Sequence, residues 1–324
     1  MTAAGGEGRI HSVPSPQSSV LFFGMFGPLS RAPLAALLTA GVDVRAIVVP
    51  PRGAGTGTAR PRRLARPPGW EARPRSLPAL LGRTVVDLAW EHDIPVLEVG
   101  GLGGETARAL ATFAPDLDLI AVSCFPFRLP DALLALPRLG CLNVHPAPLP
   151  RHRGPAPLFW IFRGGSGRGG VTVHLMDRGL DSGPIVTQEG FDLGDGLTGA
   201  ELELRCAALG ADLLTAAIRD LAAGTAAPRA QDEAFATTEP WPRASDFIIT
   251  PDWPARRAFN FIRGTAGWGH PHVIALGGAR LTVRAAVAYD PAARLDVPFL
   301  EDSSEVRVQC SPGVLTITTI GNGG

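Results

Sequence analysis

The sequence predicts an α/β protein in which a Rossmann-like, mostly parallel sheet flanked by helices precedes a small β-barrel-like C-terminal domain. Between residues 19 and 145, short apolar runs alternate with stretches of helical period, as in proteins with a parallel sheet. From residue 272 onward, short alternating segments are separated by glycine turns, as in small all-β domains. A length of 324 residues suits about two such domains.

We expect four parts in order. A disordered tail spans 1–18, the α/β domain spans 19–224, a linker spans 225–244, and the small β domain spans 245–324. The tail has no basic segment followed by a long apolar run, so it does not read as a signal peptide. No stretch approaches the roughly 20 apolar residues of a membrane span.

The α/β pattern can be followed element by element. The opening apolar run ends in glycines, as a buried first strand does, and the following helix is closed by glycine. The opening turn, GMFGPLS, lacks the GxGxxG spacing of a dinucleotide-binding loop. The expected order is strand 19–27, helix 33–41, strand 42–49, helix 79–93, strand 94–99, helix 103–115, strand 116–123, helix 129–137, strand 140–145, a strand pair at 170–176 and 184–188, and a long helix at 198–224.

The composition narrows the classes of function. Apolar residues make up 45% of the chain and the net charge is zero, which supports a sizeable core and argues against a nucleic-acid-binding charge over the whole surface. The cysteines are scattered and form no CxxC pair, so we expect no metal site and no disulfide framework, and reduced thiols in a cytoplasmic protein. They are Cys124, Cys141, Cys206 and Cys310.

Residues 50–78 interrupt the pattern with seven arginines, one glutamate and many prolines and glycines. Such a segment cannot bury a core, so we expect a long, mobile, basic loop. It is either a solvated connection or an electropositive arm for a phosphate-bearing substrate.

The candidate site lies where apolar strands end. Asn143 and His145 share strand parity and lie at the carboxyl end of their predicted strand, as Phe125 follows the end of the preceding one. Ligands bind at this edge of open parallel sheets. Asp181 lies in a glycine-flanked turn between two later strands. A lone histidine at a strand end is also often structural, so both interpretations stay open on spacing alone.

These residue types suit acyl transfer. An asparagine amide can donate to a developing oxyanion, a histidine can exchange a proton near neutral pH, and a carboxylate can orient the imidazole. Ser182 is in no nucleophile-elbow pattern. The attacking group would therefore be an amine or water supplied with the substrate.

Two stretches resemble a known family. NVHPAPLPRHRGPAP and GVTVHLMDRGLDSGPIV are similar to the signature of folate-dependent formyltransferases, and the similarity runs from about residue 19 to about residue 235. Within the family, the domain order is most similar to members that act on methionyl-tRNA. The resemblance implies that Asn143, His145 and Asp181 are catalytic. It places Ala147, Pro148, Leu149 and Pro150 at folate-contacting positions.

The resemblance also implies the substrates. The donor would be 10-formyltetrahydrofolate, with no metal, and the acceptor an amine, foremost the amino group of methionyl-tRNA. In this reading Asn143 and His145 hold the formyl oxygen, and Asp181 keeps the imidazole charged. The basic loop from Arg52 to Arg75 would touch the tRNA. Formylation of a small amine such as an amino-sugar nucleotide, hydrolysis of the donor, and a binding module without turnover are the alternatives.

Some positions depart from the family or have a second interpretation. Ala147-Pro148 replaces the usual Ser-Leu, which removes a hydroxyl and a backbone N–H donor. The β domain, 245–324, has seven arginines and seven acidic residues and so carries no net charge, whereas a tRNA-binding surface is expected to be basic. Phe125 either lines the pteridine pocket or belongs to the core. We expect Arg153 to scaffold its loop by hydrogen bonds to neighbouring carbonyls, and His174 to be structural.

Overall fold

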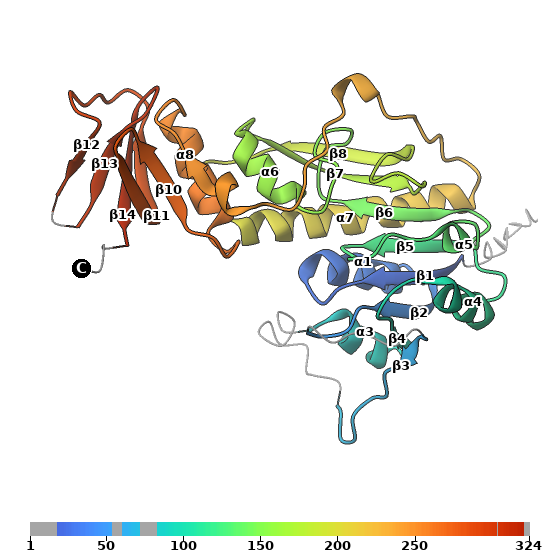
Figure 1. Ribbon diagram of the computed structural model, residues 1–324. Helices are drawn as coiled ribbons and strands as arrows, with labels where there is room; N and C mark the ends of the chain where they lie inside the picture. Colours follow the sequence, from blue (N-terminus) through green and yellow to red (C-terminus); the bar gives the residue numbers. More distant parts are fainter. Residues whose placement is uncertain (1–17, 54–59, 72–82, 303, 321–324) are drawn as a thin grey trace, which may run out of the picture.

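The computed structural model describes residues 18–53, 60–71, 83–302 and 304–320. Two sheets make up the molecule, and they lie at opposite ends of it with helices between them (Figure 1). The expected tail falls almost entirely outside the described residues. Among the described helices, none has the length and apolar character needed to cross a membrane.

The first sheet has the predicted parallel centre. Its strand order is β3-β4-β2-β1-β5-β6-β7-β8, and β4, β2, β1, β5 and β6 run parallel to one another. These strands are apolar and buried because helices cover both faces. Their bounds are β1 Ser19–Gly24, β2 Asp43–Val49, β4 Val96–Glu98, β5 Leu119–Ser123 and β6 Cys141–His145.

The far edge of this sheet is antiparallel, as the predicted strand pair requires. β7 (Arg168–Leu175) pairs with β6 and with β8 (Ile185–Asp192). Because β7 is antiparallel to β6, residues 176–184 leave the sheet beside the first residues of β6, where the Met176 N–H donates to the Cys141 carbonyl. The turn contains Asp181, whose carboxylate lies beside Asn143 of β6.

Helices form two layers around the sheet. One face is covered by α1 (Pro28–Thr39), α3 (Val85–Glu91) and α7 (Gly199–Ala222), and the other by α4 (Gly104–Phe113) and the short α5 (Asp131–Leu134). α1 begins earlier than predicted because Pro28 starts a helix without losing a hydrogen bond. A capping box between Thr198 and Glu201 fixes the start of α7.

The C-terminal part contains a helix that the sequence analysis missed. α8 (Ala255–Thr265) packs on a six-stranded sheet of order β12-β13-β14-β11-β10-β9. Its apolar residues recur at helical spacing, but the segment is short and rich in arginine, which hid the pattern. The strands are β9 Ile248–Ile249, β10 His272–Leu276, β11 Ala279–Asp290, β12 Phe299–Glu301, β13 Val306–Gln309 and β14 Val314–Thr319.

The two sheets share one apolar core. Phe159 of α6 (Pro157–Gly164) contacts Phe261 of α8 and Phe247, with ring centroids 5.5 and 5.0 Å apart. At the same junction Asp195 accepts hydrogen bonds from Arg256, Asn260 and Tyr289. The C-terminal sheet is therefore fixed to the first by both apolar and polar contacts.

Part of the arginine-rich loop is structured, which corrects the expectation of a mobile segment for residues 60–71. The two-residue strand β3 (Arg62–Arg63) pairs with β4, and Arg62 forms an ion pair with Glu98. Arg60 and Arg66 form ion pairs with Glu105 and Asp93. Acidic partners from the neighbouring elements thus offset much of the charge. The rest of the loop, 54–59 and 72–78, lies outside the described residues.

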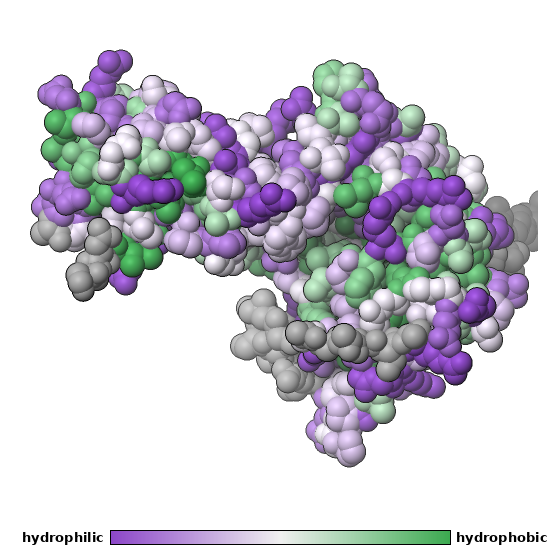
Figure 2. Space-filling view, in the orientation of Figure 1, coloured by the Kyte–Doolittle hydropathy of each residue, from purple (hydrophilic) through white to green (hydrophobic). Residues whose placement is uncertain are grey.

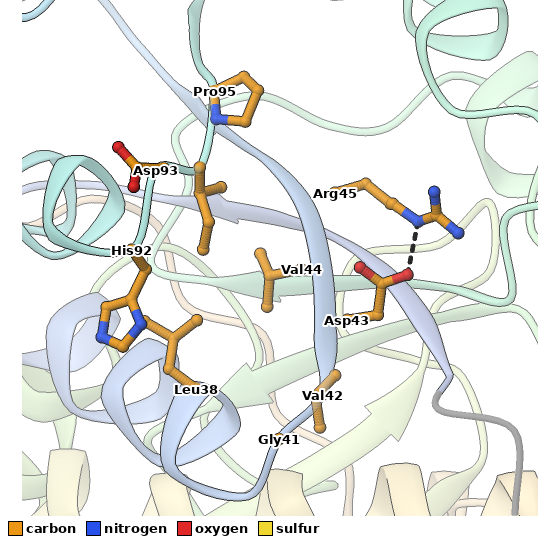
Figure 3. Close-up of a pocket in the computed structure, with 10 residues that line it drawn as sticks. Leu38, Gly41, Val42, Asp43, Val44, Arg45, His92, Asp93 and Pro95 are labelled. Carbon is orange, nitrogen blue, oxygen red and sulfur yellow. Dashed lines mark ion pairs between the residues drawn. The ribbon is translucent and has the colours of Figure 1, made fainter.

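A surface depression between β2 and β4 lies away from the predicted site. Figure 3 shows it lined by Leu38, Asp43, Arg45, His92 and Pro95, with an ion pair of 2.7 Å between Asp43 and Arg45. These residues precede or begin β2 and β4, so they lie at the amino ends of the parallel strands. Ligands of such sheets bind at the opposite edge.

Candidate active site

The pairing of β6 with β7 places the polar side chains of two strands side by side. Asn143 is opposite His174, and His145 is opposite Thr172. Leu142 and Val144 face the α7 side of the sheet, so Asn143 and His145 point to the other face, as their parity predicts. The strand ladder therefore fixes three polar residues at one place.

Asp181 completes a compact cluster. Asn143 Nδ2 lies 3.3 Å from Asp181 Oδ1 and 3.2 Å from His174 Nε2. Asp181 Oδ2 lies 3.7 Å from His145 Nδ1, and Asp181 Oδ1 lies 3.7 Å from His174 Nε2. The three predicted residues are thus brought together, and His174 joins them. His174 was expected to be structural because it lies inside a predicted strand, and its place beside Asn143 depends on the register of β7 against β6, which the sequence does not show.

His174 is held in a defined tautomer when neutral. Its Nδ1 is 2.9 Å from the carbonyl oxygen of Leu175, which can only accept a hydrogen bond. Nε2 then accepts from the Asn143 amide. Because Asn143 Nδ2 also faces the Asp181 carboxylate, both amide protons point into the cluster in the free protein.

Backbone geometry fixes the carboxylate. Asp181 has a φ of 55°, in the left-handed region, and its Oδ2 accepts a hydrogen bond of 2.9 Å from the Gly154 N–H. A side chain at Gly183 would put its Cβ 1.8 Å from the carbonyl oxygen of Leu175. Close packing therefore requires a glycine at position 183, the last residue of the GLDSG turn.

Burial and neighbouring charges act in opposite directions on the pKa values of Asp181 and His145. Burial alone would raise the pKa of Asp181, but the neighbouring His145 and the hydrogen bond from the Gly154 N–H lower it to about 2. Burial lowers the pKa of His145 below its ordinary value, although Asp181 opposes the shift. These directions favour an ionised Asp181 beside a neutral His145 in the free protein at pH 7, and the charged imidazole expected during transfer stays a prediction.

The other nitrogen of His145 contacts the proline loop. Nε2 donates to the carbonyl oxygen of His152 at 2.7 Å. His152 has a φ of 61°, and its own ring Nδ1 lies 3.5 Å from Glu239 Oε1 of the linker. The orientation of the His145 ring thus depends on the backbone of residues 151–153.

Residues 147–150, the predicted folate-contacting positions, direct much of their backbone into the protein. Thr172 Oγ1 donates to the carbonyl of Ala147 and accepts from the N–H of Leu149. Gln188 donates to the carbonyl of Leu149. The carbonyls of Pro148 and Pro150 accept from the N–H groups of Arg151 and Thr237. Folate contact by these four residues stays a prediction, and their half-buried prolines are the surface left for it.

The linker packs against this loop. The N–H of Arg153 donates to the carbonyl of Thr237, and the N–H of Glu239 donates to the carbonyl of Arg153. A Cβ at Gly154 would lie 2.1 Å from the carbonyl oxygen of Glu239. This contact could not be predicted from the sequence, because the linker has no helical or strand period that indicates where it runs.

Arg153 is a buried scaffold, with partners that differ from the neighbouring carbonyls predicted. Its guanidinium donates to Gln231 Oε1 and to both carboxylate oxygens of Glu233. Both partners belong to the linker.

Phe125 packs against the core. Its ring meets those of Phe23 and Phe127 edge to face, with centroids 5.2 and 5.5 Å apart. Phe23 is fully buried in β1. The structure supports the core interpretation for Phe125, and its predicted folate contact stays a prediction. Cys124 beside it is exposed, unlike the other three cysteines.

The cluster offers acid–base chemistry. Among the residues that the structure describes, no group of three or more His, Cys, Asp or Glu residues is arranged to hold a metal ion. A neutral buried imidazole beside an ionised carboxylate can take a proton, and an amide can donate to an oxygen. The Ser182 hydroxyl donates to the Asp177 carboxylate at 2.9 Å.

Comparison with known proteins identifies the class. Residues 102–218 match the model of the formyl transferase family. The methionyl-tRNA formyltransferase of Pelobacter propionicus is 34% identical over 239 residues, which cover 74% of each chain. That of Stutzerimonas stutzeri is 34% identical over 288 residues, covering 89% of this chain and 85% of the relative. The chain belongs to the formyltransferase family.

Solved structures share the fold. The N-formyltransferase from Helicobacter canadensis, solved with folinic acid and dTDP-3-aminofucose, is 15% identical. It matches 92% of this chain and 98% of its own with a TM-score of 0.63. The match extends over most of the chain, and the predicted fold class is confirmed.

Proposed function

We propose that this formyltransferase moves the formyl group of 10-formyltetrahydrofolate to an amine, foremost the amino group of methionyl-tRNA. The observation that carries the proposal is the cluster of Asn143, His145 and Asp181 at the carboxyl end of β6. The relatives' activity on methionyl-tRNA supports the acceptor. Protein biosynthesis is then the process served, and a cytoplasmic location stays a prediction.

The chemistry follows from the protonation states. The acceptor nitrogen attacks the formyl carbon, and neutral His145 takes the proton that this nitrogen loses. Ionised Asp181 stabilises the imidazolium as it forms. The bond from the formyl carbon to N10 of the folate then breaks, and His145 returns the proton to N10. Atoms and charge balance, and tetrahydrofolate leaves with the formamide as the other product.

Asn143 donates to the oxyanion after one of its amide N–H groups changes its hydrogen-bond partner. Its amide hydrogen bond to Asp181 is long, at 3.3 Å, and Asn143 is half-buried, whereas His145 and His174 are buried. The oxygen of the tetrahedral intermediate replaces Asp181 as the partner of this N–H. The second N–H stays on His174, which keeps the amide oriented. An oxyanion donor of this kind contributes about 10²–10³ in rate.

The basic loop from Arg52 to Arg75 is the proposed contact for the tRNA. In the sheet, β3 and β6 are five strand spacings apart, roughly 24 Å at the usual separation of strands. Only an extended acceptor can reach both the loop and the cluster. The side chains of Arg60 and Arg62 are 80% and 61% exposed, which leaves them open to phosphates in spite of their ion pairs.

A small amine on a nucleotide-linked sugar is the second candidate acceptor. Residues 245–324 carry seven arginines and seven acidic residues. On the face shown in Figure 2, hydrophilic and hydrophobic residues are mixed over this part. A tRNA surface is expected to be basic, whereas a small acceptor has no such requirement.

The experiment is an acceptor comparison. The purified protein is incubated with 10-formyltetrahydrofolate, and tetrahydrofolate release is followed with methionyl initiator tRNA, with amino-sugar nucleotides, and with no acceptor. Release that depends on the tRNA supports the proposal. Release only with an amino sugar moves the acceptor to the second candidate, release without acceptor indicates a hydrolase, and no release in any mixture overturns formyl transfer.

A further inference from the structure

One side chain of the linker joins the two loops that flank the cluster. Gln231 Oε1 accepts from Arg153 Nε at 3.1 Å and from Arg153 Nη2 at 2.9 Å. Gln231 Nε2 donates to the carbonyl oxygens of Asp181 and Gly183 at 2.7 and 2.8 Å. Both amide protons and the amide oxygen are therefore used. The amide bridges the proline loop to the Asp181 turn.

The arginine at one end of this bridge is firmly held. Arg153 is 7% exposed, and its guanidinium also forms a bidentate pair with Glu233 at 2.7 and 3.0 Å. Its own N–H donates to the carbonyl of Thr237. The next residue, Gly154, donates its N–H to the Asp181 carboxylate. The loop that receives Gln231 is thus the same loop that holds the carboxylate.

At the other end of the bridge, the backbone of the Asp181 turn is strained and needs support from its surroundings. Asp181 adopts a left-handed backbone conformation, which costs about 1–3 kcal/mol for a residue other than glycine unless its surroundings enforce it. Its carboxylate must stay 3.7 Å from the rings of both His145 and His174. Gln231 donates to the carbonyl of this same residue, and to that of Gly183 two residues on. Removing both donors takes away the side-chain link between the turn and the linker, and leaves the backbone pair between Arg229 and Ile185, two residues after the turn.

We propose that Gln231 is a positioning residue that holds Asp181 against His145 for formyl transfer. This inference rests on the proposed function. It assigns the linker a role in the site besides connecting the two sheets. Misplacing a reacting group by about 1 Å can cost as much as about 10²-fold in rate, so a residue that touches no substrate can have a large effect on kcat.

The test uses two variants and a matched control. Gln231→Met keeps the approximate shape and removes every hydrogen bond. Gln231→Glu keeps the acceptor for Arg153 and loses the donors to the two carbonyls. Gln309→Met is the control, because Gln309 bridges backbone groups in the same way: it donates to the carbonyls of Cys310 and Gly313 and accepts from the N–H of Leu295 in the C-terminal sheet.

The first readout is steady-state transfer with both substrates, per folded enzyme as measured by circular dichroism. We expect kcat to fall by as much as about 10²-fold in both Gln231 variants, with KM values within about threefold of wild type. Gln309→Met should lose thermal stability and keep its kcat. An unchanged kcat in the Gln231 variants overturns the proposal, as does a wild-type kcat in Gln231→Glu alone, since that places the effect on Arg153.

The second readout needs no substrate. The His145 ring is titrated by NMR, where the groups that face it are Asp181, His174, His152 and Glu239. Because the Asp181 charge raises the pKa of His145, a displaced Asp181 lowers this pKa in Gln231→Met, which introduces no new charge. An unchanged titration overturns the proposal. If the wild-type protein transfers no formyl group, the proposed function fails, and this titration still decides the role of Gln231.

Discussion

The active-site cluster has two walls that are held in different ways. Asn143, His145 and His174 form the strand wall: they lie on adjacent strands, and the ladder between β6 and β7 sets their positions. Asp181 and the proline loop form the loop wall: they lie on connections, and hydrogen bonds from side chains and from the linker, rather than a strand ladder, set their positions. A strand places a side chain through many backbone bonds at once, whereas a loop depends on a few. The two walls should therefore respond differently to substitution.

The largest effect is expected on the strand wall. His145→Asn removes the proton acceptor and keeps a polar side chain of smaller size. Transfer should fall by about 10²–10⁴-fold, the usual contribution of general acid–base catalysis. Circular dichroism should show an unchanged fold, because the ladder of β6 does not depend on the ring. Activity within tenfold of wild type would remove His145 from the chemistry.

Asp181→Asn tests the contribution of the loop wall by removing the charge of Asp181. The amide retains an acceptor for the Gly154 N–H but loses the charge beside His145, so kcat should fall by about 10²-fold or more. The Asp181 charge raises the pKa of His145, and its removal moves that pKa further below the ordinary value. NMR titration of the His145 ring should show protonation at lower pH than in wild type, and a shift to higher pH would contradict the account.

Gly154→Ala tests the contact between the proline loop and the linker. The new Cβ would meet the carbonyl of Glu239, and Gly154 has a φ of 122°. We expect a loss of about 1–3 kcal/mol in the free energy of unfolding from backbone strain, increased by the collision. Gly269→Ala is the control, because Gly269 also has a positive φ, of 79°, and nothing lies within 4 Å of its Cβ position. Equal losses in urea unfolding would show that the linker contact contributes nothing.

The smallest effect concerns the arginine loop. Neutralising Arg60, Arg62, Arg63 and Arg66 together should weaken tRNA binding and flatten its dependence on salt, by less than about one unit of slope per arginine. The ion pairs with Glu98, Glu105 and Asp93 already offset part of the charge. An unchanged slope would exclude the loop from the tRNA contact.

The same two walls explain how far the sequence predicts the structure. The strand wall was predictable, because alternation along residues 140–145 fixes which side chains share a face, and apolar runs locate the strands. The approach of Asp181 came from the family resemblance. His174 was missed because its role depends on the register of β7, and Gln231 because nothing in an aperiodic linker indicates its path. α8 was missed because its apolar positions are interrupted by arginines.

One measurement tests the central claim most directly: a single-turnover experiment with labelled 10-formyltetrahydrofolate and methionyl initiator tRNA, comparing wild type with Asp181→Asn. The account predicts that the wild-type protein places the label on the methionyl amino group. It also predicts that the variant, folded and given the same substrate concentrations, does so about 10²-fold more slowly. Equal rates in the two proteins would contradict the assignment of the chemistry to this cluster.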